Sequence, residues 1–211
     1  MADRTRMTEQ VRQSHWENIF RTKDYREVLW HQNSPTVSYD LITQYAAKDD
    51  TILDAGCGAS LLVDKLIESG YNNITLLDTA ATSLEIVKTR LGRSADIPAY
   101  VCTDIMDFLP DRLYTIWHDR AVFHFLLEPQ ERTDYFKKVL QSLAPGGVAI
   151  ISTFRVGGQT QCAGLDIVQY DHQKISEELP EGLKLIAYEE FTHITPAASE
   201  QAYSAFVIKK L

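Results

Sequence analysis

Three aspartates, each placed directly after a short apolar run, carry the chemistry that this sequence offers. They are Asp54, Asp78 and Asp104. If the runs are parallel strands, their carboxyl ends meet at one edge of a sheet, which is where open α/β sheets bind ligands. A carboxylate at Asp78 can accept hydrogen bonds from both ribose hydroxyls, and one at Asp104 can accept from an adenine amino group. Together the three acids predict a nucleoside-binding site.

The loop after the first acid narrows the choice of nucleoside. Gly56 and Gly58 allow a tight turn and let a ligand lie against the backbone. Nicotinamide dinucleotide enzymes share the turn and the ribose acid, but their fingerprint G-x-G-x-x-G has a glycine where this chain has Leu61. Asp54 would repel a pyrophosphate, whereas it would attract the cationic amino group and sulfonium of S-adenosylmethionine. The loop therefore favours S-adenosylmethionine as the cofactor, and an ordinary strand-to-helix turn is the alternative.

The spacing of apolar residues predicts the elements that position these acids. Strand-like runs alternate with segments of helical spacing, which predicts an α/β fold: a Rossmann-like, doubly wound, mostly parallel sheet with helices on both faces. No helix separates the last two runs, so an antiparallel last strand is expected. The predicted strands are 51–53, 73–78, 98–102, 114–117, 148–154, 183–191 and 202–209, and the predicted helices are 36–47, 60–69, 80–91, 129–143 and a short one capped by Asp171.

The length of 211 residues favours a single domain with three parts. Residues 1–47 are predicted to form an N-terminal helical lid or extension, residues 48–155 the cofactor-binding core, and residues 156–211 a substrate-side loop and the C-terminal strands. Aromatic side chains such as Trp16 and Trp30 punctuate the first part. They are expected either to close over the cofactor or to pack the first helix onto the sheet.

Composition and charge limit the partners. The formal net charge of -8 disfavours nucleic acid, because the basic residues form no extended patch. No apolar run approaches the roughly 20 residues of a membrane helix, and the N-terminus lacks the apolar core of a signal peptide, so we expect a cytoplasmic protein that does not enter a membrane. The three cysteines have no metal-ligand spacing, and no metal is expected. A monomer is favoured, with the oligomeric state left open.

Taken together, these motifs resemble those of class I S-adenosylmethionine-dependent methyltransferases. Residues 54–58 are similar to the first motif of that family, Asp78 to its ribose-binding acid and Asp104 with Ile105 to its adenine-contacting pair. One departure is Ser60, where many members have a third glycine. The resemblance implies the sheet order 3-2-1-4-5-7-6 with the seventh strand antiparallel, and it implies methyl transfer as the activity.

The expected cofactor contacts follow from the acids, the glycine loop and this resemblance. They lie at the ends of the first four strands, with one aromatic residue from the N-terminal part. The set is Asp54, Gly56, Cys57, Gly58, Asp78, Thr79, Asp104, Ile105, His118 and Trp30.

The segment after the fourth strand is similar to a subgroup that includes the elongation-factor lysine methyltransferases, and bacterial small-molecule methyltransferases are at least as close. The lysine enzymes have an Asp-Lys-Gly-Thr-Phe-Asp type sequence here. Asp119 and Phe123 match it, Arg120 replaces the lysine, and His124 stands in place of the second aspartate. The last change argues against a lysine substrate.

Three side chains of this segment are predicted to meet the methyl acceptor. Asp119 can orient a nucleophile or accept its proton, Arg120 can neutralise an anionic group, and His124 can act as a base on the same helical face as Arg120. The structural alternatives are that Asp119 caps the following turn, that His124 packs beneath this turn, and that Arg120 pairs with an acid.

The leading hypothesis is therefore methyl transfer from S-adenosylmethionine to a small molecule. Protein lysine methylation and a catalytically idle nucleoside-binding domain are the alternatives. The chain lacks the Asn/Asp-Pro-Pro-aromatic loop of nucleic-acid amino methyltransferases and the Pro-Cys nucleophile of cytosine-carbon enzymes. A deep, aromatic-walled pocket would favour a small molecule, an open acidic groove a lysine, and a blocked path to the methyl group an idle domain.

Overall fold

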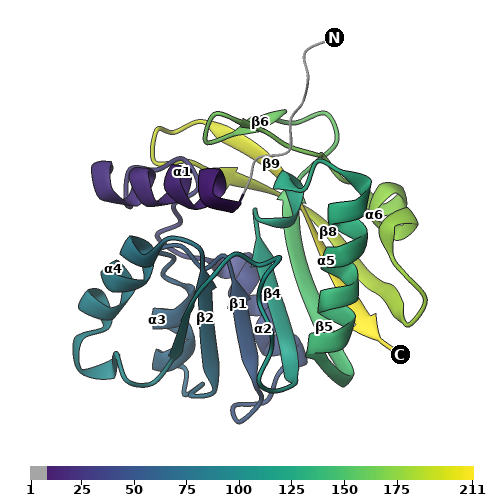
Figure 1. Ribbon diagram of the computed structural model, residues 1–211, viewed down its shortest axis with the longest axis horizontal. Coiled ribbons are helices and arrows are strands. Elements are labelled where there is room, and N and C mark those ends of the chain that lie inside the picture. Colours follow the sequence, from purple (N-terminus) through teal and green to yellow (C-terminus); the bar gives the residue numbers. More distant parts are fainter. Residues whose placement is uncertain (1–8) are drawn as a thin grey trace.

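A computed structural model describes residues 9–211 (Figure 1). Strands and helices alternate along the chain as far as β5, as the apolar runs predict. The elements are α1 (Glu9–Thr22), α2 (Thr36–Tyr45), β1 (Ile52–Ala55), α3 (Leu62–Glu68), β2 (Ile74–Asp78), α4 (Ala81–Leu91), the 3-10 helix η1 (Gly92–Ser94), β3 (Ala99–Cys102), β4 (Tyr114–Arg120), the 3-10 helix η2 (Phe123–Phe125), α5 (Pro129–Ser142), β5 (Leu143–Phe154), β6 (Gln161–Cys162), β7 (Leu165–Asp166), α6 (His172–Glu178), β8 (Leu183–Ile194) and β9 (Glu200–Lys210).

Seven of these strands form one sheet in the order β3-β2-β1-β4-β5-β9-β8, and β6 pairs with β7 in a separate hairpin. Strands β1 to β5 pair in parallel, whereas β9 is antiparallel to both of its neighbours. With β9 as the seventh strand and β8 as the sixth, this is the order that the family resemblance implies. The predicted Rossmann-like fold is confirmed.

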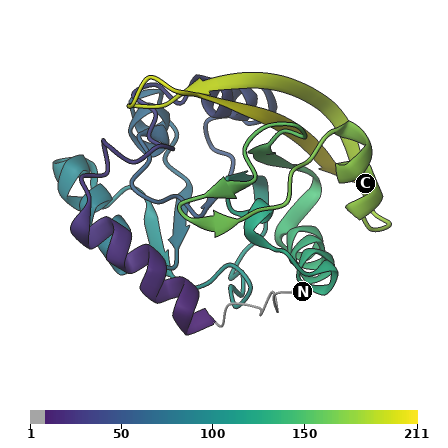
Figure 2. The same cartoon turned by 90° about the horizontal axis from the view of Figure 1, so that it is seen from above.

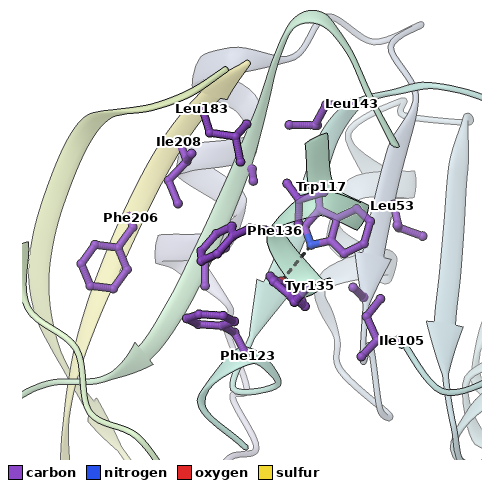
Figure 3. Packing of buried hydrophobic residues seen from close by; sticks show 14 of the residues in the cluster. Leu53, Ile105, Trp117, Phe123, Tyr135, Phe136, Leu143, Leu183, Phe206 and Ile208 are labelled. Carbon is purple, nitrogen blue, oxygen red and sulfur yellow. Dashed lines mark hydrogen bonds between the residues drawn. The ribbon is translucent and has the colours of Figure 1, made fainter. Parts of the chain in front are cut away.

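Both faces of the sheet are covered by helices. Successive strand residues point to opposite faces, so in β4 Ile116 packs with α2, α3 and α4, while Trp117 packs with α5 and α6. The buried Trp117 indole N–H donates to the hydroxyl of Tyr135 at 3.0 Å (Figure 3). The packed sheet gives a fixed base for the side chains at its carboxyl edge.

The fourth strand is longer than the sequence pattern predicts. β4 continues to Arg120, which pairs with Ser152 of β5. His118, Asp119 and Arg120 therefore belong to the strand and alternate between its faces, instead of sharing a loop after it. The predicted common helical face of Arg120 and His124 is wrong, because the first ends a strand and the second lies in η2.

Two segments lie over the carboxyl ends of the strands: α1 and the β6–β7 hairpin (Figure 2). α1 ends at Thr22, so Trp30 of the predicted N-terminal part lies beyond it. Glu17 fastens α1 to the start of α4, since its carboxylate accepts from the Thr82 backbone N–H at 3.1 Å. Residues 1–8, which belong to the predicted lid, lie outside the described residues. None of the helices in residues 9–211 is long and apolar enough to cross a membrane.

Candidate functional site

The strand ends and the two covering segments line a partly open cavity of about 110 Å³. A second cavity of about 60 Å³ lies beside it and shares part of its wall. The first is lined by Arg12, Trp16, Phe20, Trp30, Gly56, Gly58, Leu77, Asp78, Thr79, Thr103, Asp104, Ile105, Arg120, Ala121, Val122, Phe125, Leu126 and Cys162. The second is lined by Phe20, Tyr25, Val28, Trp30, His31, Gln32, Ser38, Asp54, Gly56, Cys57, Gly58, Ala59, Ser60, His118 and Arg120.

All ten predicted cofactor contacts line one or both of these cavities. The acids of β2 and β3, with Thr79 and Ile105, line the larger one, and the acid of β1, with Cys57 and His118, lines the smaller one. The two glycines and Trp30 belong to both walls. The fold thus brings together residues from separate motifs, which span 75 positions of sequence from Trp30 to Ile105.

The glycine loop depends on backbone conformations that other residues rarely adopt. Gly56 and Gly58 have φ values of +66° and +53°. A Cβ on Gly56 would lie only 2.1 Å from Cγ2 of Val122. Cys57, between them, is buried, and burial raises the pKa of its thiol, which disfavours the reactive thiolate and fits a packing role.

Asp78 is held at the end of β2 by backbone N–H groups. Its Oδ2 accepts from Gly58 N at 2.7 Å, and its Oδ1 accepts from Ala80 N at 2.8 Å. Burial, opposed by these hydrogen bonds, raises the pKa of the carboxyl to about 6. A carboxylate oxygen has room for a further donor, and this one lines the larger cavity.

Asp104 meets a cation from α1. Arg12 donates from Nε to Asp104 Oδ2 at 3.0 Å and from Nη1 to Glu131 at 3.3 Å. The other oxygen of Asp104 accepts from the backbone of Met106 at 2.9 Å. Arg12 therefore ties α1 to the end of β3 and to α5, and this contact closes one side of the cavity.

A buried chain of hydrogen bonds holds the acid of the first motif. His118 Nδ1 lies 2.7 Å from Asp54 Oδ1, and His118 Nε2 lies 2.9 Å from Ser38 Oγ. In the neutral tautomer that fits both contacts, Nδ1–H donates to the carboxylate and Nε2 accepts from the hydroxyl. The predicted contact His118 thus lies beside the smaller cavity and also orients Asp54.

Two of the three residues predicted to meet the acceptor do not line either cavity. Asp119 accepts from the Tyr135 hydroxyl at 2.5 Å and from the backbone of Val122 at 3.0 Å, and burial raises its pKa to about 6. His124 is fully buried, and burial together with the nearby Arg120 lowers its pKa to about 3. These contacts match the structural alternatives for both residues, in which Asp119 caps the turn after β4.

Arg120 does line both cavities. Its Nη1 donates to the backbone carbonyl of Trp30 at 2.9 Å. Its Nε and Nη2 are buried and have no hydrogen-bond partner. The guanidinium carbon lies 5.1 Å from the centre of the Tyr203 ring of β9. Within residues 9–211 no carboxylate forms an ion pair with Arg120, so the alternative that it pairs with an acid is wrong.

Several wall residues were missed by the sequence reasoning. Arg12, Trp16 and Phe20 recur every fourth residue and place one face of α1 on the larger cavity. That spacing is a signal in the sequence which could have added Arg12 to the site. Ser38 and Phe125 have no such signal, since their positions follow from packing alone.

Comparisons with known proteins agree with this geometry. Residues 53–151 match a family model described as a methyltransferase domain. The chain is 24% identical over 174 residues to a malonyl-[acyl-carrier protein] O-methyltransferase 1 of Ilyobacter polytropus, a match that covers 82% of this chain and 61% of that one. It is also 25% identical over 141 residues to an eEF1A lysine and N-terminal methyltransferase homolog of Drosophila melanogaster, covering 63% of this chain and 21% of that one.

Solved structures show the same fold. The 1,6-didemethyltoxoflavin-N1-methyltransferase of Burkholderia thailandensis superposes with a TM-score of 0.78 at 16% identity and covers 99% of this chain and 93% of that one. A SAM-dependent methyltransferase from Anabaena variabilis gives a TM-score of 0.76 at 14% identity, covering 98% and 96%. At such identities the likeness concerns the fold. The chain spans about half to three fifths of the length of the first curated relatives that it matches.

Proposed function

Since the chain contains a methyltransferase domain with the class I, Rossmann-like fold, we propose that it transfers the methyl group of S-adenosylmethionine to a small molecule. The observation that supports a small acceptor most directly is the cover that lies over part of the larger cavity. α1 covers one side of it, and Cys162 of the β6–β7 hairpin contributes to its wall. A small molecule fits such a space better than a side chain on the surface of a folded protein does.

The residues along the two cavities fit the cofactor. Asp78 lies at the strand end expected to receive the ribose, Asp104 at the one expected to receive adenine, and Gly56 presents bare backbone at the end of β1, next to β2. The buried Asp54 supplies negative charge beside the smaller cavity, which suits the cationic amino group. When bound, S-adenosylmethionine supplies a methyl group on a sulfonium: a lone pair of the acceptor forms the new bond to carbon, and the electrons of the broken S–C bond stay on sulfur.

Aromatic rings form the wall opposite the strand ends. Trp16 contacts Trp30 edge to face with ring centres 5.8 Å apart, and Trp16 contacts Phe125 at 5.2 Å. Such rings exclude water and attract a cation by its interaction with their π-electrons. The wall supports an acceptor that is small, partly apolar and shielded from solvent.

No base for the acceptor lines the larger cavity in the part of the chain that the structure describes. Its ionisable wall residues are Arg12, Asp78, Asp104, Arg120 and Cys162. The two acids are assigned to the cofactor, and burial raises the pKa of Cys162 to about 11. His124 and Asp119 lie behind the wall. We therefore assign the protein the task of aligning the two reactants, with an acceptor whose nucleophilic lone pair is available without proton removal by a side chain.

The proposal is tested by following label from methyl-tritiated S-adenosylmethionine. The purified protein is incubated with a cell extract that has been divided by ultrafiltration into small molecules and proteins. Label in the small-molecule fraction supports the proposal. Label confined to protein, as a lysine enzyme would give, contradicts it. A Gly56→Ala variant serves as the negative control, because its loop cannot keep the same backbone and packing.

A further inference from the structure

One edge of the Arg120 guanidinium has no hydrogen-bond partner. Nη1 is occupied by the Trp30 carbonyl at 2.9 Å. The remaining groups, Nε–H and the outward N–H of Nη2, are buried and unpaired. These two N–H bonds run parallel along one edge of the planar group, which is the arrangement that binds both oxygens of a carboxylate.

The positive charge of Arg120 is also uncompensated. Within residues 9–211 it forms no ion pair, although it lies at the end of a buried strand. Its charge acts on the buried groups around it: it lowers the pKa of His124 and opposes the rise that burial causes in the pKa of Cys162 and Tyr203. Arg120 as a whole is half-buried, but its Nε and Nη2 are buried, and leaving such atoms with neither a counter-charge nor hydrogen bonds is costly unless a ligand supplies both.

Neighbouring strands add further polar groups without partners. The Ser152 hydroxyl on β5, at the register position of Arg120, is buried and unpaired, and so is the Tyr203 hydroxyl on β9. Unpaired buried polar groups are rare in folded proteins and call for an explanation. Here they surround one cation at the margin of the larger cavity.

We propose that the unpaired edge of Arg120 binds a carboxylate of the methyl acceptor, so that the substrates are small carboxylic acids in their ionised form. The inference rests on the proposed small-molecule methyl transfer and assigns its acceptor class. Arg120 acts in it by holding and orienting the acceptor.

The position of the guanidinium separates the acceptor from the cofactor. The three acids lie on β1, β2 and the end of β3, on one side of β4 in the sheet. The guanidinium lies on the other side, against the Tyr203 ring of β9 and near Cys162 of the hairpin. A carboxylate on its free edge is therefore placed across the larger cavity from the ribose and adenine acids.

The charge alone does not separate the two acceptor classes. The lysine enzymes of the related subgroup have a lysine where this chain has Arg120, so both carry a cation at this position. What Arg120 adds is a planar fork of N–H groups that can hold both oxygens of a carboxylate.

The test uses the whole chain saturated with S-adenosylhomocysteine. Acetate and benzoate are titrated by calorimetry at millimolar concentration, with benzamide as the neutral isostere of benzoate. We expect carboxylate binding in the unmodified protein and at least about tenfold weaker binding of benzamide, because benzamide has no charge and offers the fork only one acceptor oxygen. Arg120→Met should abolish the preference for benzoate. Arg120→Lys should weaken it by about tenfold, because an ammonium keeps the charge without the fork.

Two controls make the result decisive. Arg155→Met removes an exposed arginine that pairs with Glu190 outside the cavity, and it should leave carboxylate binding unchanged. The affinities of S-adenosylhomocysteine and of 5′-methylthioadenosine, which lacks the amino acid part, are compared in Arg120→Met. Both should stay within about threefold of the unmodified protein.

Three results would overturn the inference. One is equal binding of benzoate and benzamide, and another is no carboxylate binding at all. The third is a loss of S-adenosylhomocysteine affinity in Arg120→Met with unchanged 5′-methylthioadenosine affinity, which would assign the edge to the cofactor. If the unmodified protein does not bind S-adenosylhomocysteine, the proposed function fails as well; label in the small-molecule fraction without carboxylate selectivity removes only the inference on Arg120.

Discussion

If Asp78 binds the cofactor as we propose, cofactor binding should depend on pH in a way that the structure specifies. Burial raises the pKa of this carboxyl from 3.8 to about 6, although two backbone N–H groups donate to it. The ribose hydroxyls are expected to donate to the ionised form. Cofactor binding must therefore displace the proton wherever Asp78 is protonated, and affinity should fall as the pH drops below 6.

The magnitude follows from the size of the shift. A pKa difference of about two between folded and unfolded chain corresponds to about 3 kcal/mol. Because the folded pKa is raised, the cofactor-free protein loses up to this amount of stability as the pH rises from the unfolded value, 3.8, through the folded value, about 6. At about pH 5, some ten protonated molecules exist for each ionised one, so the dissociation constant of S-adenosylhomocysteine should be about tenfold higher than at about pH 7.5.

Calorimetric titrations of S-adenosylhomocysteine in one mixed buffer across this range measure the effect. The Asp78→Asn variant should bind S-adenosylhomocysteine at least about tenfold more weakly at neutral pH, because the charged acceptor is gone. For the same reason its affinity should not change with pH across this range. Asp119→Asn is the matched control, since Asp119 has a raised pKa of about 6 as well but does not line either cavity. A dissociation constant that is the same at both pH values, or a dependence that disappears with Asp119 and persists without Asp78, would refute the reasoning.

Three further predictions concern the residues around this acid. Asp119→Asn should lower the free energy of unfolding by about 1–3 kcal/mol in denaturant titrations, because its amide cannot accept from both Tyr135 and the turn, and the folded fraction should bind S-adenosylhomocysteine normally. Gly56→Ala should lower the free energy of unfolding more than Gly70→Ala does, because Gly70 also has a positive φ of +89° but nothing within 4 Å of a new Cβ. Equal losses would mean that the contact of the new Cβ with Val122 relaxes freely. Arg12→Gln should speed hydrogen exchange in α1 by releasing Asp104 and Glu131, whereas Arg21→Gln, in the last turn of the same helix, should leave it unchanged.

The fold and the cofactor side of the site could be predicted from the sequence because their signals are local. Asp54 and Asp78 lie at the carboxyl ends of β1 and β2, and Asp104 follows β3 by two residues; a parallel sheet brings such positions together whatever the loops do. The sheet order needed the family resemblance, since nothing in the spacing of strands fixes which of them are neighbours. The structure confirms that order.

The acceptor side of the site could not be predicted in the same way. The residue at which the fourth strand ends decides which face of the sheet each following side chain takes. Ending the fourth strand at Trp117 puts Asp119 and His124 in a loop over the cavity. Continuing it to Arg120 turns Asp119 inward, to the buried hydroxyl of Tyr135. Apolar periodicity carries no signal here, since the strand ends on the polar residues His118, Asp119 and Arg120.

Contacts between residues far apart in the sequence are the second limit on what the sequence can predict. Arg12 reaches Asp104 across 92 positions of sequence, and Ser38 reaches His118 across 80. Neither pair has a motif, because each depends on how a helix packs against the sheet. The spacing on α1 marks Arg12 as a residue of the site but not its partner, and the sequence around Ser38 looks like ordinary helix surface.

The distribution of charge across the cavity gives the two halves of the proposal a common physical basis. Acids lie on the side of β1 to β3, and the uncompensated Arg120 lies on the side of β5 and β9. A sulfonium bound between them is attracted by the first group and repelled by Arg120, whereas an acceptor carboxylate on Arg120 removes that repulsion. Each ligand then favours the other, and the coupling is reciprocal by linkage. Once the sulfonium has lost its charge, the attraction to the carboxylate is lost too, and this arrangement therefore assists release of the products.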